Sequence, residues 1–224
     1  MQIGLFIVVG IVAVIAVAWF GYIAKQRRRD AFALMARQLG LEYSAQDPYG
    51  TLSEPFAFFE KGDGRGVENV LSGTWQGLDV RLFDYWYYDE STDSKGQTSR
   101  TYYRFDCVMV PVEAGCPRLT ITHENVGTRL ANALTFHDIQ FESEAFNRDF
   151  YVKSSDVKFA NDLVDARMMD WLLKHADGFS FEVAGIEALC YQKKLEPIDV
   201  VPLLGTAKAF LDHVPRVVYS LYPR

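Results

Sequence analysis

Residues that could carry chemistry are few in this sequence, and their spacing completes no catalytic or nucleotide-binding motif. Glycines recur at Gly62, Gly64 and Gly66, a spacing found in phosphate-binding loops. Such a loop lies between a strand and the N-terminus of a helix, whereas the residues after Gly66 have the pattern of a strand. We therefore interpret these glycines as a turn. The chain also lacks the G-x-x-x-x-G-K-[ST] and G-x-S-x-G motifs.

Four histidines and three cysteines are the candidate metal ligands, and their spacing argues against a metal site. His123 lacks the second histidine four residues on that a zinc-protease helix requires, and the cysteines form no C-x-x-C pair. Cys107 lies in an apolar run, which raises the pKa of a thiol and leaves it unreactive. The odd count, with Cys116 and Cys190, suits a reducing compartment. We predict no catalytic residue, no cofactor and no metal.

Aromatic residues are the most conspicuous group, and they cluster on two neighbouring segments. Residues 78–88 and 100–112 have the pattern of strands, joined by a polar hairpin loop at 89–99. Consecutive aromatics place rings on both faces of a sheet, so one set fills the core and the other is covered or exposed. Cross-strand packing explains most such ladders, but an exposed set marks a contact with a partner. The candidate binding surface comprises Tyr85, Trp86, Tyr87, Tyr88, Tyr102 and Tyr103.

The N-terminal segment is the clearest signal of location. Residues 1–24 contain no charged side chain, and the apolar run from Ile3 to Ala24 would reach about 33 Å as a helix, enough to cross a bilayer. A signal peptide would need a basic start and a small-residue cleavage site, which are absent. We predict a transmembrane anchor at 1–24, so that residues 3–24 contact the lipid bilayer.

A basic collar follows the apolar run and predicts the orientation. It comprises Lys25, Arg27, Arg28 and Arg29. Basic residues beside a span favour the cytoplasmic side, so we expect the N-terminus outside and the C-terminal domain in the cytoplasm. The collar either only fixes this topology or also contacts anionic headgroups. The chain has 23 Lys plus Arg, and 19 remain when the four collar residues are removed. Against 29 acidic residues they leave a net charge of −10 for residues 30–224. This negative charge excludes nucleic acid as a partner.

The remainder of the chain predicts an α+β fold of ordinary globular composition, with 49% hydrophobic and 23% charged residues. A juxtamembrane helix at 30–39 leads to a meander of four or five antiparallel strands, drawn from 56–60, 67–75, 78–88, 100–112 and 118–123. A strand at 146–152, a helix from Ser154 or Ser155 to about 176, a hairpin at 179–192 and a helix from Glu196 or Pro197 to about 213 follow. Pro202 delays or kinks this last helix.

Domain boundaries follow from these elements. We expect an anchor at 1–24, a collar and juxtamembrane helix at 25–43, and one cytoplasmic α+β domain at 44–224. A division into two subdomains near residue 140 stays open, because the strand-rich part ends there. The loop at 89–99 is the only low-complexity segment.

The segment that begins at Phe146 has the pattern F-x-x-x-F-x-V-x-x-x-D-x-x-x-A, formed by Phe146, Phe150, Val152, Asp156 and Ala160. A Met/Leu-rich helix end and an aromatic-tipped hairpin at 179–191 follow it. In these features the chain resembles a bacterial family of membrane-anchored proteins of unknown function. The resemblance covers about a third of the chain and implies a bacterial inner-membrane setting. It implies no catalytic residue, and the matching positions also suit a strand followed by a helix cap.

Together these patterns favour a binding protein over an enzyme. The leading hypothesis is a single-pass membrane protein whose cytoplasmic domain is a protein-interaction or scaffolding module, because catalytic and cofactor motifs are missing. One alternative is a hydrolytic enzyme acting near the membrane, which requires a pocket with converging polar side chains. Another is a lipid or small-ligand binder that uses the aromatic sheet face.

Overall fold

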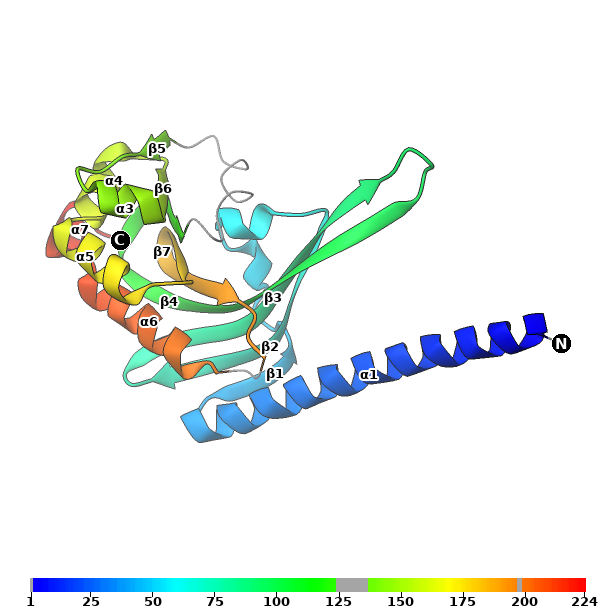
Figure 1. The fold of residues 1–224 in the computed structure, drawn as a ribbon. Helices are drawn as coiled ribbons and strands as arrows, with labels where there is room; N and C mark the ends of the chain where they lie inside the picture. Colours follow the sequence, from blue (N-terminus) through cyan, green and yellow to red (C-terminus); the bar gives the residue numbers. More distant parts are fainter. Residues whose placement is uncertain (1, 124–136, 197–198) are drawn as a thin grey trace.

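The protein is an antiparallel sheet flanked by helices, so the α+β prediction is confirmed (Figure 1). The structure, a computed structural model, describes residues 2–123, 137–196 and 199–224, and within the first helix it leaves out the side chains of residues 2–9 and 13. The strands are β1 (Glu42–Gln46), β2 (Gly64–Trp75), β3 (Leu78–Thr92), β4 (Thr98–His123), β5 (His137–Ile139), β6 (Phe150–Ser154) and β7 (Ser180–Lys193). The helices are α1 (Gln2–Leu39), α3 (Glu144–Asp149), α4 (Val157–Leu163), α5 (Ala166–His175), α6 (Val201–His213) and α7 (Arg216–Leu221), with short 3₁₀ turns η1 (Thr51–Ser53) and η2 (Ala57–Glu60).

The sheet is organised around β4, its longest strand. The strand order is β1-β2-β3-β4-β6-β5, and β7 also pairs with β4. β3 pairs with residues 98–109 of β4, whereas β7 pairs with residues 105–121 and β6 with residues 119–123. The predicted meander is therefore present as β1 to β4. Between β2 and β3, Gln76 and Gly77 both have positive φ, which is the geometry of a two-residue hairpin turn.

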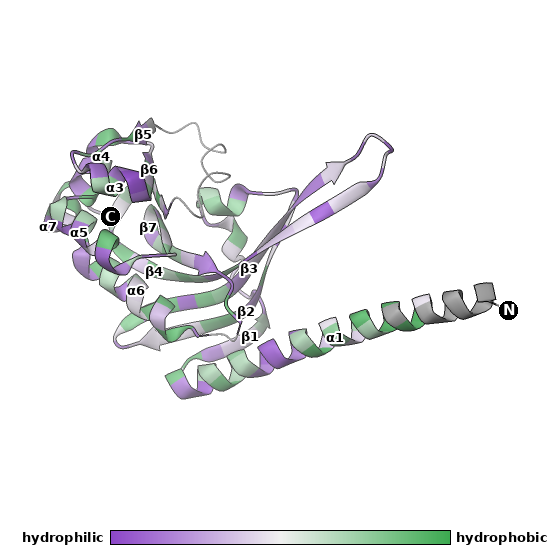
Figure 2. Cartoon of the chain, in the orientation of Figure 1, coloured by the Kyte–Doolittle hydropathy of each residue, from purple (hydrophilic) through white to green (hydrophobic). Residues whose placement is uncertain are grey.

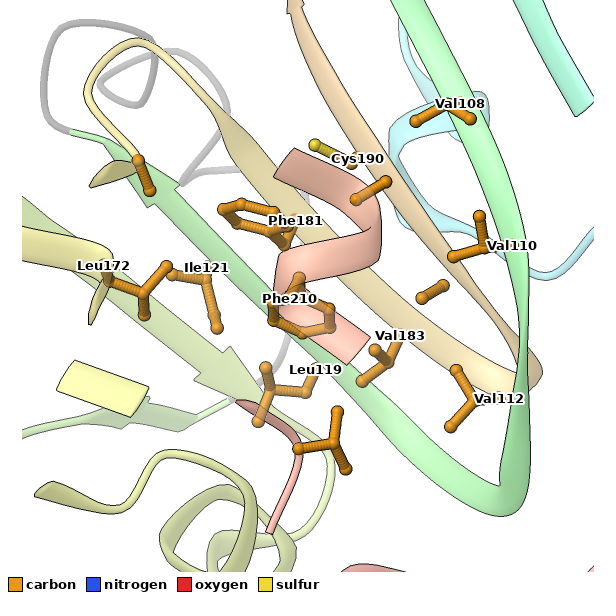
Figure 3. Packing of buried hydrophobic residues seen from close by; sticks show 14 of the residues in the cluster. Val108, Val110, Val112, Leu119, Ile121, Leu172, Phe181, Val183, Cys190 and Phe210 are labelled. Carbon is orange, nitrogen blue, oxygen red and sulfur yellow. The ribbon is translucent and has the colours of Figure 1, made fainter. Parts of the chain in front are cut away.

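Two hydrophobic clusters cover the two faces of the sheet. The larger one packs β4 and β7 against α5, α6 and the end of α1, and Figure 3 shows part of it. There Phe210 of α6 stacks on Phe181 of β7 at a centroid distance of 4.7 Å, beside Val183 and Leu119. The smaller cluster joins η2 to the aromatic residues of β3, β4 and β7. Both faces are thus buried, which explains the consecutive apolar residues of these strands.

α1 is a single helix in which the expected anchor and juxtamembrane helix are continuous. Its second half packs on the sheet through Phe32 and Ala36, whereas its first half stands clear of the domain (Figures 1 and 2). The sequence predicts a membrane span at residues 3–24. Among the described residues, however, no helix is both long enough and apolar enough to cross a membrane.

Several strand predictions need correction. The strand predicted at 56–60 is instead the 3₁₀ turn η2, which covers Ala57–Glu60. The meander begins at β1, which was not predicted as a strand. β3 and β4 continue through most of the predicted loop at 89–99. The two strands expected at 100–112 and 118–123 are one strand, in which register shifts beside Cys116 replace the expected break. A bulge lets a long strand bend without ending, which alternation of residue types does not reveal.

In the last third of the chain, several helices and strands begin or end at other residues than the sequence predicts. Phe146 lies in α3 and only Phe150 and Val152 lie in β6. The expected long helix is divided into α4 and α5, because Asp156 caps the first and Asp165 caps the second through hydrogen bonds to Phe159 N and Met168 N. Residues 180–193 form one strand rather than a hairpin. The last helix begins at Val201 with Pro202 in its first turn, as the proline predicts, and residue 197 lies outside the described residues.

Candidate functional site

A buried ion cluster joins α1 to the sheet. Arg28 is 6% exposed and donates from Nε and Nη2 to the two carboxylate oxygens of Asp84 on β3, both at 2.7 Å. Its Nη2 also contacts Asp106 of β4 at 2.5 Å, and its Nη1 donates to the Leu195 carbonyl at 2.9 Å. Asn69 of β2 completes the cluster by donating to Asp84. One arginine of α1 thus joins β3, β4 and the segment after β7, and Asn69 links β2 to them through Asp84.

Burial raises the pKa of Asp106 to about 6, although the Leu195 amide and Arg28 both lower it. One guanidinium faces two buried carboxylates, and the charge of Asp84 adds to the effect of burial. Arg28 is therefore the residue on which the attachment of α1 depends, because without it two carboxylates would be buried side by side.

The basic collar is divided by this arrangement. Arg28 lies in the protein interior, so its assignment to the membrane collar is corrected. Lys25 pairs with Glu68 of β2 at 2.7 Å, and Arg29 is half-buried. Arg27 is exposed and, among the described residues, has no carboxylate within 4.0 Å. Successive residues of a helix point in different directions, so the basic residues of the collar do not share one surface.

The candidate aromatic surface separates into two sets by strand alternation. Tyr85 and Tyr87 are 1% and 7% exposed and belong to the smaller core cluster, so they are not part of a surface. Phe58 of η2 lies over them and stacks on Tyr191 at 3.9 Å. Tyr103 is half-buried and stacks on Tyr87 at 4.8 Å. The candidate surface is therefore corrected for Tyr85 and Tyr87, whereas the half-buried Tyr103 stays partly accessible.

The other set lies on the opposite face of an arm, which we define as residues 86–104 of β3 and β4. The arm extends beyond the rest of the sheet (Figure 1). Trp86 stacks on Tyr88 at 6.3 Å, and Tyr102 lies within 6.0 Å of both rings and is 48% exposed. Arg100 covers Tyr88 at 4.6 Å and Arg104 covers Tyr102 at 5.6 Å. These alternating aromatic and arginine side chains form a rigid, partly exposed surface.

Glycines on β2 make room for this surface. Gly66 pairs with Trp86 and Gly64 pairs with Tyr88. A Cβ atom at Gly66 would lie 2.6 Å from the Trp86 ring, and one at Gly64 would collide with the Tyr88 ring. Only Gly62, with φ +72°, lies in the expected turn. The turn prediction is thus corrected for Gly64 and Gly66, whose function is to let two rings lie flat across the neighbouring strand.

A groove runs between α1 and the base of the arm. It has a volume of about 670 Å³, and we call it the root groove. A second hollow of about 460 Å³ shares Arg104, Lys194 and Glu196 with it and ends at Tyr102 and Tyr103. The root groove is lined by Gly21, Ala24, Lys25, Arg27, Arg28, Ala31, Glu68, Asn69, Arg104, Lys194 and Glu196. No serine, cysteine, threonine or histidine lines either hollow among the described residues, so neither holds a Ser-His or Cys-His pair.

A buried carboxylate holds η2 against the sheet, and the sequence gives no signal of it. Glu182 of β7 is 1% exposed and accepts hydrogen bonds from the amides of Ala57 at 2.5 Å and Phe58 at 3.1 Å. Burial raises its pKa to about 7. Burial also lowers the pKa of Lys61 to about 7, and the Lys61 ammonium has no hydrogen-bond partner among the described residues. Because Glu182 binds backbone amides, we assign it to the fold.

Within the described residues, no group of three His, Cys, Asp or Glu side chains is arranged to hold a metal ion. The three cysteines are buried, and burial raises the pKa of Cys116 to about 11 and those of Cys107 and Cys190 well above their ordinary value.

Comparison with known proteins identifies the fold. No protein-family model matches the chain, and no curated protein matches its sequence. The crystal structure of the mycobacterial trehalose monomycolate transport factor A, TtfA, is similar, with a TM-score of 0.58 over 84% of this chain and 93% of that chain. The two sequences are 15% identical, so the likeness shows that this chain has the same fold as TtfA.

Proposed function

We propose that the chain is a membrane-anchored interaction module in which α1 embeds its first half in a bilayer and holds the domain at the surface. The observation that carries this proposal is the exposure of that half. Its large apolar side chains are 55% to 73% exposed from Ile11 to Tyr22 and cover all sides of the helix: Ile11, Val12, Val14, Ile15, Val17, Trp19, Phe20 and Tyr22. Apolar surface of this extent is normally covered by lipid or by another protein.

The second half of α1 makes the anchor rigid. Because Arg28, Phe32 and Ala36 are buried against the domain, no flexible linker separates the apolar half from the sheet. A rigid connection fixes the orientation of the domain relative to the bilayer, and with it the position of the arm. This suits a protein that presents a surface to a partner in or beside the same membrane.

The arm supplies that surface. Trp86, Tyr88 and Tyr102 with Arg100 and Arg104 combine the residue types that contribute most at protein interfaces. Their geometry is fixed in advance by the glycines of β2, which lowers the entropy lost on binding. We infer a protein partner that binds this face. TtfA is described as a transport factor, and an accessory role in transport at a membrane would suit such a module.

The bacterial setting and the orientation, with the domain in the cytoplasm, remain part of the proposal. Lys25 and Arg27 are the exposed basic residues that support it. A reporter fused after Arg224 tests it: we expect green fluorescent protein to fluoresce there and alkaline phosphatase to be inactive. The reverse pattern would place the domain on the other side of the membrane.

A photocrosslinker tests the binding surface. Replacing Tyr102 with p-benzoylphenylalanine in cells should give a discrete crosslinked product, because this ring is 48% exposed on the arm. Tyr151, which is 36% exposed on β6, is the matched control position and should give none. The Tyr102 product should also disappear in Trp86→Ala. Equal products at both positions, or none at Tyr102, would refute the arm as the interface.

A further inference from the structure

We propose that the root groove binds the phosphate headgroup of an anionic phospholipid. This deepens the proposed function and rests on its claim that α1 enters the bilayer. The groove begins at Gly21 and Ala24, where the exposed apolar half of α1 ends, and continues to Arg104 at the base of the arm. It therefore lies at the depth where headgroups meet the protein. The acyl chains would follow the apolar surface of α1 from Tyr22 toward the N-terminus.

The charge of the groove is opposite to that of the chain. Five basic and two acidic side chains line it, whereas the whole chain carries a net charge of −6. Arg28 is offset by Asp84 and Asp106 behind it and also contacts Glu196 of the groove at 3.2 Å. Basic charge concentrated in one hollow of an acidic protein attracts an anion to that place and repels it elsewhere.

Two arginines remain free to bind an anion. Lys25 pairs with Glu68 at 2.7 Å, and Lys194 pairs with Glu196 at 2.8 Å. In the described part of the chain, Arg27 and Arg104 have no carboxylate within 4.0 Å. Both side chains are exposed and line the groove, so they are accessible to an anion.

The guanidinium group suits phosphate because its planar fork donates two parallel hydrogen bonds to two oxygens. Arg104 lies over the Tyr102 ring at 5.6 Å, which holds the side chain at the wall of the groove. Gly21 and Ala24 on the opposite wall carry no bulky side chain, so they leave space for a headgroup. Arg28, fixed by Asp84, forms the floor. The result is a hollow lined mainly by basic side chains beside the exposed apolar half of α1.

The test measures lipid retention by the full chain in nanodiscs. Wild-type protein is incorporated into discs of phosphatidylcholine alone or with phosphatidylglycerol, and native mass spectrometry counts the lipids that stay bound after release. We expect wild type to retain phosphatidylglycerol preferentially. The double variant Arg27→Gln/Arg104→Gln should lose about thirtyfold of that preference, since each basic residue near the surface contributes about 1 kcal/mol. The matched control Arg37→Gln/Arg216→Gln removes the same charge from exposed positions outside the groove and should behave like wild type.

Each other outcome is decisive. Equal preference in wild type and the groove variant, or equal loss in the control variant, overturns the site. Displacement of the retained phosphatidylglycerol by inorganic phosphate at the same concentration overturns the lipid as its occupant, because a free anion would then suffice. Incorporation into the neutral discs tests α1 alone: failure there refutes the anchoring, whereas normal incorporation without phosphatidylglycerol preference refutes only the groove.

Discussion

Arg28 and Asp84 form a bidentate ion pair, in which both guanidinium–carboxylate distances are 2.7 Å. We call this pair the joint, because it connects α1 to the sheet. The pair lies 56 residues apart in sequence and is almost completely buried. This buried pair attaches the second half of α1 to the sheet, so the exposed apolar half extends from a fixed position on the domain. Arg28 also lines the root groove, so the proposed membrane anchor and the proposed phospholipid site share this residue.

Replacing Arg28 with Met should destabilise the protein by about 3–5 kcal/mol, because Asp84 and Asp106 would be buried without their partner. Urea unfolding of the full chain in detergent measures this. Neutralising both acids in the same background, with Asp84→Asn and Asp106→Asn, should restore much of the loss. Arg37→Met, at an exposed position on the same helix, should change the free energy of unfolding by less than about 0.5 kcal/mol. A loss in Arg28→Met no larger than that control would contradict the joint.

Gly66→Ala should displace the Trp86 ring, because a Cβ atom there would lie 2.6 Å from it. We expect a loss of about 1–3 kcal/mol from this overpacking and a shift in Trp86 fluorescence. Gly205→Ala is the control, because a Cβ atom at Gly205 in α6 would have no neighbouring atom within 4 Å, and this variant should gain about 0.5–1 kcal/mol. If Gly66→Ala leaves both stability and fluorescence unchanged, the glycines do not set the arm surface.

Stability should fall between pH 4.5 and pH 7 because of Glu182. Its pKa is raised to about 7, so the folded state holds a proton that the unfolded chain loses near pH 4.5. The contribution is fully present below pH 4.5 and is lost as the pH rises through 7, with an amplitude on the order of 3 kcal/mol. Chemical unfolding at a series of pH values should show that Glu182→Gln reduces this decline, while the part due to Asp106, whose pKa is raised to about 6, remains. The exposed control Glu113→Gln should retain it.

Lys61 should act in the opposite direction at higher pH. Its pKa is lowered to about 7, so the unfolded chain binds a proton that the folded state has released, and the contribution of Lys61 to the free energy of unfolding should rise between pH 7 and pH 10.5. The three buried thiols, whose pKa values are raised, act against this rise in its alkaline part. Lys61→Met should flatten this alkaline rise in the same titration. If the rise is unchanged in Lys61→Met, burial does not lower the pKa of Lys61.

The cysteines should be inert in the folded protein. Cys107 and Cys190 are buried with raised pKa values, and the pKa of Cys116 is about 11, so the reactive thiolate is scarce at pH 8. An aromatic disulfide reagent should modify none of them before unfolding and all three afterwards. Ser94→Cys at the exposed tip of the arm should react at once and serves as the positive control. Rapid modification of the native thiols would contradict their burial.

Periodicity predicted the α+β class, the meander and the helical N-terminus, since each depends on residue patterns within one segment. The alternation along β3 also implied two aromatic sets, but it could not say which was buried. That choice depends on Phe58, which reaches Tyr85 and Tyr191 from η2 and covers one face. Likewise, β4 continues past Cys116 because β7 and β6 pair with it there, and no local signal reports those neighbours.

The site residues were predictable only in part. Tyr102 and Trp86 stand out by residue type, and both lie on the arm surface. Arg28 was predicted to lie at the membrane because its charge matches that of its neighbours, whereas its partners Asp84 and Asp106 come from strands far along the chain. Glu182 was missed for the same reason. A buried charge is identified by its partner, and one sequence does not show which residues meet.

The depth of α1 in a bilayer tests the central claim most directly. Nitroxide labels are placed at Val14→Cys and Leu34→Cys, which are 70% and 56% exposed on the two halves of the same helix. In nanodiscs we predict that the label at position 14 collides mainly with dissolved oxygen, which concentrates in lipid. The label at position 34 should collide mainly with a water-soluble nickel chelate. Equal access of the nickel chelate to both positions would contradict the membrane-anchored account.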